Sequence, residues 1–270
     1  MAGISSDSLA TALAELEPRL TGATPALAQE LFEVLSVLDS SAGLRRALTD
    51  PARPAADKLG LLSSLLKGKV SAEAESIVSS LVAERWSDAR SLGDALERVA
   101  ATVAIAVAEN AAQSKGLEEL ERTLFEFSQV VGSNHEVQRA LTSPEATAEA
   151  KRTLALKLVP GAGEAATVLI SQAVTSPRGL QPAKLVDRFA ALAAARQNRW
   201  IAAVSTSRPL SAEQQTRLKA GLDRLYGREL NLNASVDPSL IGGIRVRVGD
   251  EVVDASLVTR LGELHRQLVG

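Results

Sequence analysis

Apolar side chains recur every three or four residues along most of the chain, which is the spacing of one face of an α-helix. The pattern predicts helices at about 73–86, 90–112, 164–175 and 181–198. Two further stripes of this kind are formed by Leu27, Leu31, Val34 and Leu38, and by Leu117, Leu120, Leu124 and Phe127. Each stripe fits the core of a helical bundle, and it equally fits a groove that accepts a partner helix, because both use the same residue types.

The pattern changes after Trp200, where the alternation of strands appears. Ile201 to Thr206 predicts a strand, and Leu230 to Val236 stands between the next helix and a hairpin. Within residues 244–248, three apolar side chains alternate with two arginines, which is the period of a half-buried strand. Gly249-Asp250 is the kind of two-residue turn that joins hairpin strands, so we expect Val252 and Val253 to begin the return strand.

Two helices are predicted around these strands. Ser211 and Gln214 have the spacing of a capping box, which marks a helix start. The apolar face of that helix is predicted to be Leu218, Leu222 and Leu225. The last helix of the chain is predicted from the helical spacing of Leu257, Leu261, Leu264 and Leu268.

The chain contains an internal repeat with an offset of 93 residues. Arg46-Ala-Leu-Thr49 recurs as Arg139-Ala-Leu-Thr142, and Leu31-Phe-Glu33 recurs as Leu124-Phe-Glu126. A repeat of this length exceeds the 20–50 residues of a solenoid unit, so it indicates a duplicated helical domain. The segment from Leu92 to Gln113 is predicted to close the first copy and open the second.

Both copies carry the same signals for helix starts and helix ends. Asp50-Pro51 and Ser143-Pro144 each place a capping side chain before a proline, which predicts a helix start at these prolines. Gly68 and Gly161 are predicted to end the next helix.

The expected fold class is therefore mainly α, with two tandem helical bundles followed by a small α+β domain that holds a β-hairpin and a terminal helix. We expect a first helical bundle at residues 1–105, a second at 106–198 and the α+β domain at 199–270.

Composition narrows the classes of function. Hydrophobic residues make up 46% of the 270 residues but aromatic ones only 3%, which favours close-packed helices. The formal net charge of −2 provides no basic field for nucleic acid, so no nucleic-acid partner is expected. The absence of cysteine excludes disulfides and thiol catalysis. The first residues lack the pattern of a signal peptide, and the longest apolar run, Val99 to Ala108, is half of what a bilayer crossing needs and predicts a buried helix.

Residues that could carry chemistry are sparse. His135 and His265 have no second metal-type ligand at a regular spacing, so we expect surface or boundary positions for both. Gly161 and Gly163 are not followed by the Gly-Lys-Ser/Thr of a phosphate loop. The sequence therefore predicts no catalytic residue, no bound metal and no cofactor.

The C-terminal region resembles the delta subunit of F-type ATP synthases, which is called the oligomycin-sensitivity-conferring protein in mitochondria. The resemblance covers roughly the last seventy residues. It rests on an apolar run, an acidic residue, paired glycines and an alternating strand, here Leu232, Val236, Asp237, Leu240, Gly242, Gly243, Ile244, Val246 and Arg247. A single helical bundle is usual in this family, so the duplication is a departure, and the first copy is predicted to be the additional one.

The resemblance implies a non-catalytic stator that couples rotation to ATP synthesis. Its helical bundle would hold the N-terminal segment of the catalytic-head α subunit, and its C-terminal domain would hold the b subunit of the peripheral stalk. It would be a peripheral component of the complex on the cytoplasmic face of the plasma membrane. Asp237, Leu240, Gly242, Gly243, Ile244, Val246 and Arg247 would belong to the partner-binding signature.

Other interpretations of these residues remain open. Gly242-Gly243 fits a tight lead into the strand as well as a direct partner contact, and Arg245 and Arg247 fit either acidic partner residues or the solubilisation of an edge strand. A helical adaptor or regulatory protein unrelated to energy conversion is the alternative function.

Overall fold

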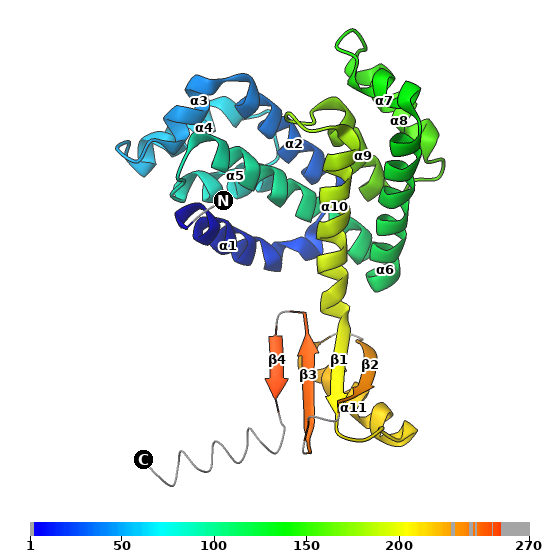
Figure 1. Ribbon diagram of the computed structural model, residues 1–270. Helices are drawn as coiled ribbons and strands as arrows, with labels where there is room; N and C mark the ends of the chain where they lie inside the picture. Colours follow the sequence, from blue (N-terminus) through cyan, green and yellow to red (C-terminus); the bar gives the residue numbers. More distant parts are fainter. Residues whose placement is uncertain (1–2, 228–229, 238–239, 241, 250, 255–270) are drawn as a thin grey trace. The chain divides into compact units, whose positions relative to one another are not determined.

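The computed structural model describes residues 3–227, 230–237, 240, 242–249 and 251–254 (Figure 1). The chain divides into two compact units, a helical unit that ends at Ala193 and a second unit that begins at Ala194. The protein is mainly helical with a small mixed sheet near its C-terminus, as the hydrophobic pattern predicts.

The first half of the helical unit is a series of short helices with side-chain caps. Thr24, Ser41 and Ser71 each stand before a helix and accept a hydrogen bond from a backbone N–H of its first turn, which satisfies one of the donors left free there. The elements are α1 (Ile4–Leu16), the 3-10 helix η1 (Glu17–Gly22), α2 (Pro25–Ser40), α3 (Ala42–Thr49), α4 (Ala55–Leu66) and α5 (Ala72–Ala83).

The long helix α6 (Ala89–Ser133) connects the two halves, with its beginning in the first half and its end in the second. Its backbone leaves helical geometry at Ala112 and Gln113, so α6 has a first arm (residues 89–111) and a second arm (residues 114–133). A Cβ on Gly116 would overlap the carbonyl oxygen of Ala108, although a straight helix would separate these residues by about 12 Å along its axis. The chain therefore turns sharply between the arms. The remaining helices are α7 (His135–Thr142), α8 (Ala148–Leu158), α9 (Glu164–Thr175) and α10 (Pro182–Gln197).

The core of the helical unit is built on the first arm of α6. Every residue from Val99 to Ala106 is buried except Thr102, which is half-buried. This confirms the predicted buried helix. The two leucine-rich stripes are also buried, on α2 and on the second arm of α6. Of the two interpretations of these stripes, the structure therefore supports core packing.

The two proline motifs do not begin helices, and this prediction is wrong. Asp50 and Ser143 end α3 and α7, and the next helices begin only at Ala55 and Ala148. The Asp50 carboxylate accepts a hydrogen bond from the N–H of Ala52 at 2.9 Å, and the Ser143 hydroxyl accepts one from Glu145 at 3.3 Å. Side chains of this kind satisfy a turn as readily as a helix start, and here they stabilise turns. Gly68 and Gly161 do follow helix ends, with φ of 72° and 87°.

The second unit is a mixed sheet with one helix. Its strands are β1 (Ile201–Thr206), β2 (Asn231–Val236), β3 (Ile244–Val248) and β4 (Glu251–Asp254), and a short 3-10 helix, η2 (Asn198–Trp200), precedes them. Among the described residues the sheet order is β2-β1-β3-β4. β1 and β2 are parallel because α11 (Ala212–Tyr226) carries the chain back between them. β3 and β4 are antiparallel, with Val248 opposite Glu251, which confirms the predicted hairpin.

α11 begins at the predicted capping box, with Ser211 and Gln214 bonded reciprocally. Its apolar face differs from the prediction at one position. Leu222 is buried and Leu218 packs against the sheet core, but Leu225 is 69% exposed and Tyr226 packs there in its place. The predicted terminal helix, including Leu257 and His265, lies outside the described residues.

Candidate functional site

The signature residues of the C-terminal region surround the start of β3. The backbone N–H of Asp237 donates to the carbonyl of Thr206 at 2.8 Å, which ties the end of β2 to the end of β1. The N–H of Leu240 then donates to the carbonyl of Asp237 at 3.1 Å, and the Leu240 side chain is buried. These two hydrogen bonds hold Asp237 and Leu240 beside the end of β1.

Gly243 immediately precedes β3 with a φ of 89°, a conformation that side chains with a Cβ rarely adopt. Val246 is buried in the sheet core and Ile244 packs against it. Arg245 and Arg247 point to the opposite face and are exposed. The structure therefore brings the signature residues together, with Arg247 as their exposed charged member. Whether they bind a partner stays a prediction.

The halves of the helical unit are joined by an ion-pair cluster around Arg178, in the loop between α9 and α10. Its guanidinium lies 2.6 Å from the carboxylate of Asp39, 3.0 Å from that of Asp94 and 3.2 Å from that of Glu97. The Arg178 side chain is only 10% exposed. A loop of the second half thus inserts a cation among three carboxylates of the first half.

Burial and charge act in opposite directions in this cluster. Burial raises the pKa of the Glu97 carboxyl, and the attraction and hydrogen bond of Arg178 offset only part of that effect. For Arg178, burial lowers the pKa, but the hydrogen bonds and charges of Asp39 and Glu97 outweigh it and the net direction is upward. The guanidinium therefore stays charged, whereas burial disfavours the charged form of the Glu97 carboxyl.

Gly93 makes room for this cation. A Cβ on Gly93 would lie 2.7 Å from Nη2 of Arg178. No sequence motif indicated Arg178 or its partners, because the three carboxylates come from α2 and α6, far from the loop in sequence. The only local signal is the run Pro177-Arg178-Gly179, which marks a turn.

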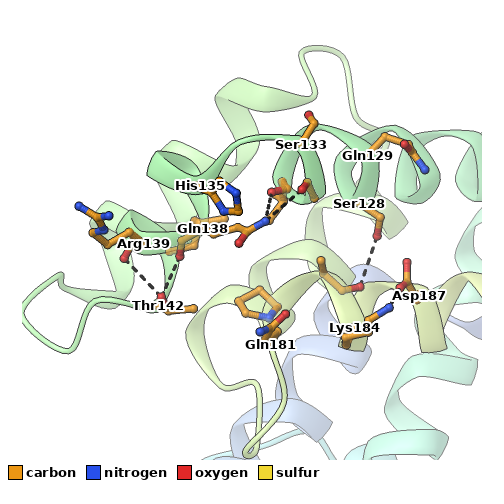
Figure 2. A pocket seen from close by; sticks show the side chains of 15 residues that line it. Ser128, Gln129, Ser133, His135, Gln138, Arg139, Thr142, Gln181, Lys184 and Asp187 are labelled. Atoms are coloured by element: carbon orange, nitrogen blue, oxygen red, sulfur yellow. Dashed lines mark hydrogen bonds and ion pairs between the residues drawn. The ribbon is translucent and has the colours of Figure 1, made fainter.

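A groove of about 870 Å³ lies in the second half, between the second arm of α6, α7 and the start of α10 (Figure 2). Its floor includes the buried side chains of Val131 and Leu141. One wall is fixed by Ser128, whose hydroxyl donates to the carbonyl of Ala183 at 3.3 Å. The side chains at its rim are polar or charged: Gln129, Ser133, His135, Gln138, Arg139, Thr142, Gln181, Lys184 and Asp187.

The groove has no evident catalytic arrangement. Lys184 pairs with Asp187 at 3.4 Å, and the Gln138 amide donates to the carbonyls of Val131 and Gly132. His135 is exposed on the rim, as predicted. Over the described part of the chain, no group of three or more His, Cys, Asp or Glu side chains is arranged to hold a metal ion.

None of the helices in the described ranges has both the length and the apolar character that a membrane crossing requires.

Comparison with known proteins places the chain in a family. The ATP synthase delta (OSCP) subunit family matches residues 99–268. The chain is 67% identical over 271 residues to an ATP synthase subunit delta of Renibacterium salmoninarum and 60% identical over 275 residues to one of Pseudarthrobacter chlorophenolicus. An ATP synthase subunit delta of Thermobifida fusca is 42% identical over 272 residues. In each case 100% of both chains is covered. The chain belongs to the ATP synthase delta (OSCP) subunit family.

Proposed function

We propose that this protein is the mechanical link between the catalytic head and the peripheral stalk, with each of its two units holding one side. As a member of its family it is a non-catalytic component of the peripheral stalk of an F-type ATP synthase. A link of this kind must not slip while the rotor turns, or proton flow would rotate the head without making ATP. The family match from residue 99 to 268, which spans helices and sheet together, carries this proposal.

The helical unit is assigned to the head, where it binds the N-terminal segment of the α subunit. This assignment follows from the resemblance of the sequence. Helix-on-helix contacts suit the task because several helices together bury a large surface, and large surfaces favour slow dissociation.

The sheet unit is assigned to the b subunit of the stalk. Asp237, Leu240, Gly242, Gly243, Ile244, Val246 and Arg247 shape this surface. Most of them act by fixing the strand, since Leu240 and Val246 are buried and Gly243 has a positive φ. Arg247, exposed on β3, is the side chain free to meet an acidic residue of b.

The helical unit is proposed to contain two copies of one helical domain. The first copy would be the additional one, and the second would correspond to the single bundle of an ordinary family member. Two observations support it. Helices α3 and α7 begin and end 93 residues apart, and so do the starts of α4 and α8 and of α6 and α10. The family match begins only at Val99, within the first arm of α6. That arm would then serve as the last helix of the first copy and the first helix of the second.

The protein is proposed to lie at the cytoplasmic face of the plasma membrane as a peripheral part of the complex. Its attachment would come from the stalk and the head, since the resemblance gives it no anchor of its own.

Removing the chain from the purified membrane complex tests the function. ATP hydrolysis by the released head should persist, while proton-driven ATP synthesis should be lost and should return when the chain is added back. If synthesis survives complete removal, the chain is not the coupling link and a general adaptor becomes the better description.

Gly243→Val tests the stalk assignment. The substitution strains the lead into β3, so binding to the isolated b subunit should weaken at least tenfold while the helical unit stays folded. Gly227→Val is the matched control, because Gly227 also has a positive φ but lies at the end of α11. Equal effects of the two substitutions, or no effect of the first, would contradict the assignment.

A further inference from the structure

We propose that the exposed strip around Phe125, on the second arm of α6, is a docking surface for a basic amphipathic helix of another subunit of the complex. The strip consists of Glu118, Glu119, Glu121, Arg122, Phe125 and Glu126. This contact is additional to the α and b assignments above, and its test rests on the proposed function because it uses the ATP synthase complex.

The molecule contains an occupied counterpart of this strip. Phe32 on α2 corresponds to Phe125 at the repeat spacing of 93 residues, within the shared Leu-Phe-Glu motif. Phe32 is only 5% exposed, because α2 packs against α9 and the Phe32 ring lies 6.3 Å from that of Phe189 on α10. Phe125 is 59% exposed. An aromatic side chain that is packed under helices in one half is therefore bare in the other.

The difference follows one face of the helix, because Ala28 and Leu35 are fully buried whereas the corresponding Glu121 and Ser128 are half-buried. Val37 and Val130 also correspond at the repeat spacing, and they are 41% and 37% exposed. The two helices thus expose their valines to a similar extent, but they differ in the exposure of their phenylalanines. A general looseness of the second half would have exposed both.

The surface beside Phe125 is hollowed. A depression of about 310 Å³ is lined by Glu118, Glu121, Arg122, Phe125 and Ala190. The position that corresponds to Ala190 is Glu97, which in the first half meets the inserted Arg178. The small side chain of Ala190 leaves space for an apolar group from outside.

The charge around the depression selects the occupant. Glu118 and Glu121 line the depression beside Phe125, and the cation next to them, Arg122, is already paired with Glu119 at 3.3 Å and with Glu126 at 2.7 Å. A helix with an apolar stripe and flanking Lys or Arg residues would cover the ring and neutralise the remaining carboxylates. An anionic lipid surface or a nucleic acid would be repelled by the same charges.

A reconstitution assay tests whether the strip contributes to binding. Complex stripped of the chain is titrated with the wild type, with Phe125→Asp and with the matched control Val37→Asp. We expect Phe125→Asp to weaken rebinding at least tenfold and Val37→Asp to change it less than twofold. Because Phe125 is exposed, both variants should keep the melting temperature of the wild type within a few degrees. Equal rebinding of all three proteins would overturn the proposal, while wild-type rebinding checks the proposed function separately.

Cross-linking identifies the occupant. A photoreactive phenylalanine analogue at position 125 is irradiated in the assembled complex, and the linked peptide is sequenced. The expected product joins position 125 to a segment of another subunit with apolar residues at helical spacing and flanking Lys or Arg. The same analogue at position 37 should not give this product. A link to lipid, to a second copy, to residues 255–270 of the chain itself or to a segment without basic residues would overturn the proposal, as would the absence of any link.

Discussion

In the first half of the helical unit Phe32 is buried beside α9 and Phe189 of α10, whereas in the second half the corresponding Phe125 is open to solvent. One contact within each half is nevertheless alike. Arg45 donates to the carbonyls of Leu38 and Asp39 at the end of α2, and the corresponding Gln138 donates to those of Val131 and Gly132 at the end of the second arm of α6. Positions 93 residues apart therefore share this contact but differ in the exposure of the phenylalanine.

Two of the three carboxylates that hold Arg178 have no acidic counterpart at the 93-residue spacing. Asp39 and Glu97 correspond to Gly132 and Ala190, which cannot pair with a cation. Gly93, which leaves space for the guanidinium, corresponds to the buried Val186. The comparison teaches that positions 93 residues apart can share a local contact, whereas the long-range contact with Arg178 depends on Asp39 and Glu97, which the second half lacks.

Arg178→Ala should cause the largest loss of unfolding free energy, because it breaks the contact between the two halves. It removes the cation and leaves three neighbouring carboxylates without it, at side-chain exposures of 13% to 37%. Loss of one partner from a buried ion pair costs about 3–5 kcal/mol, and partial exposure reduces the expected loss to about 2–3 kcal/mol of unfolding free energy. Urea denaturation followed by circular dichroism measures it.

Arg85→Ala is the control for this measurement. Arg85 stands at the position that corresponds to Arg178, but it is exposed. Its removal should change the unfolding free energy by less than about 0.5 kcal/mol. A similar loss in both variants would mean that the Arg178 cluster does not stabilise the helical unit in particular.

Gly93→Val should cause the second largest loss of unfolding free energy. The added side chain would displace the guanidinium from Asp39, and overpacking of this kind costs about 1–3 kcal/mol. Gly60→Ala is the control, because Gly60 is on an exposed face of α4 with nothing within 4 Å of an added Cβ. That control should stabilise the protein by up to about 1 kcal/mol. A stable Gly93→Val protein would show that the Arg178 loop can shift without loss.

How far the sequence predicts this molecule depends on how local each feature is. The strand at Ile201–Thr206, the hairpin turn after Val248 and the capping box at Ser211 involve neighbouring residues, and the predictions for them are confirmed. The break in α6 was not predicted, because the close approach of Gly116 to Ala108 arises only once the two arms are folded.

The candidate sites show the same limit. The signature residues around Gly243 could be found because they are contiguous. The Arg178 cluster joins residues up to 139 positions apart, and Phe125 is exposed because no helix of the described residues covers it. The hydrophobic periodicity is the same around Phe32 and Phe125. Only the tertiary structure shows that the first is buried and the second exposed.

Asp88→Ala should have a smaller effect, confined to the start of α6. The Asp88 carboxylate accepts hydrogen bonds from the N–H groups of Arg90 and Ser91 and from the Ser91 hydroxyl. Loss of such a cap costs about 1 kcal/mol. The hydrogen bonds from Ser91 and the attraction of Arg90 hold the pKa of Asp88 below its ordinary value of 3.8.

The sign of the pH dependence follows from that direction. A carboxyl with a lowered pKa contributes stability that is present above its ordinary pKa and is lost as the pH falls through the folded one. The difference in unfolding free energy between wild type and Asp88→Ala should therefore be full at pH 6 and shrink below pH 3.8. A difference that is constant through this range would mean that the cap does not depend on the charge of Asp88.

Glu97→Gln should have the smallest effect at neutral pH and the opposite sign of pH dependence. Burial raises the pKa of Glu97 above its ordinary 4.5 despite the attraction of Arg178, so the folded protein binds this proton more tightly and loses stability as the pH rises through the raised pKa. The amide avoids that cost, and Asp39 and Asp94 still hold the guanidinium. The variant should be as stable as the wild type at pH 7 or up to about 1 kcal/mol more stable, with the advantage disappearing below pH 4.5. A loss of about 2 kcal/mol or more at pH 7 in urea denaturation would show instead that the Glu97–Arg178 pair stabilises the junction between the halves by more than its burial costs.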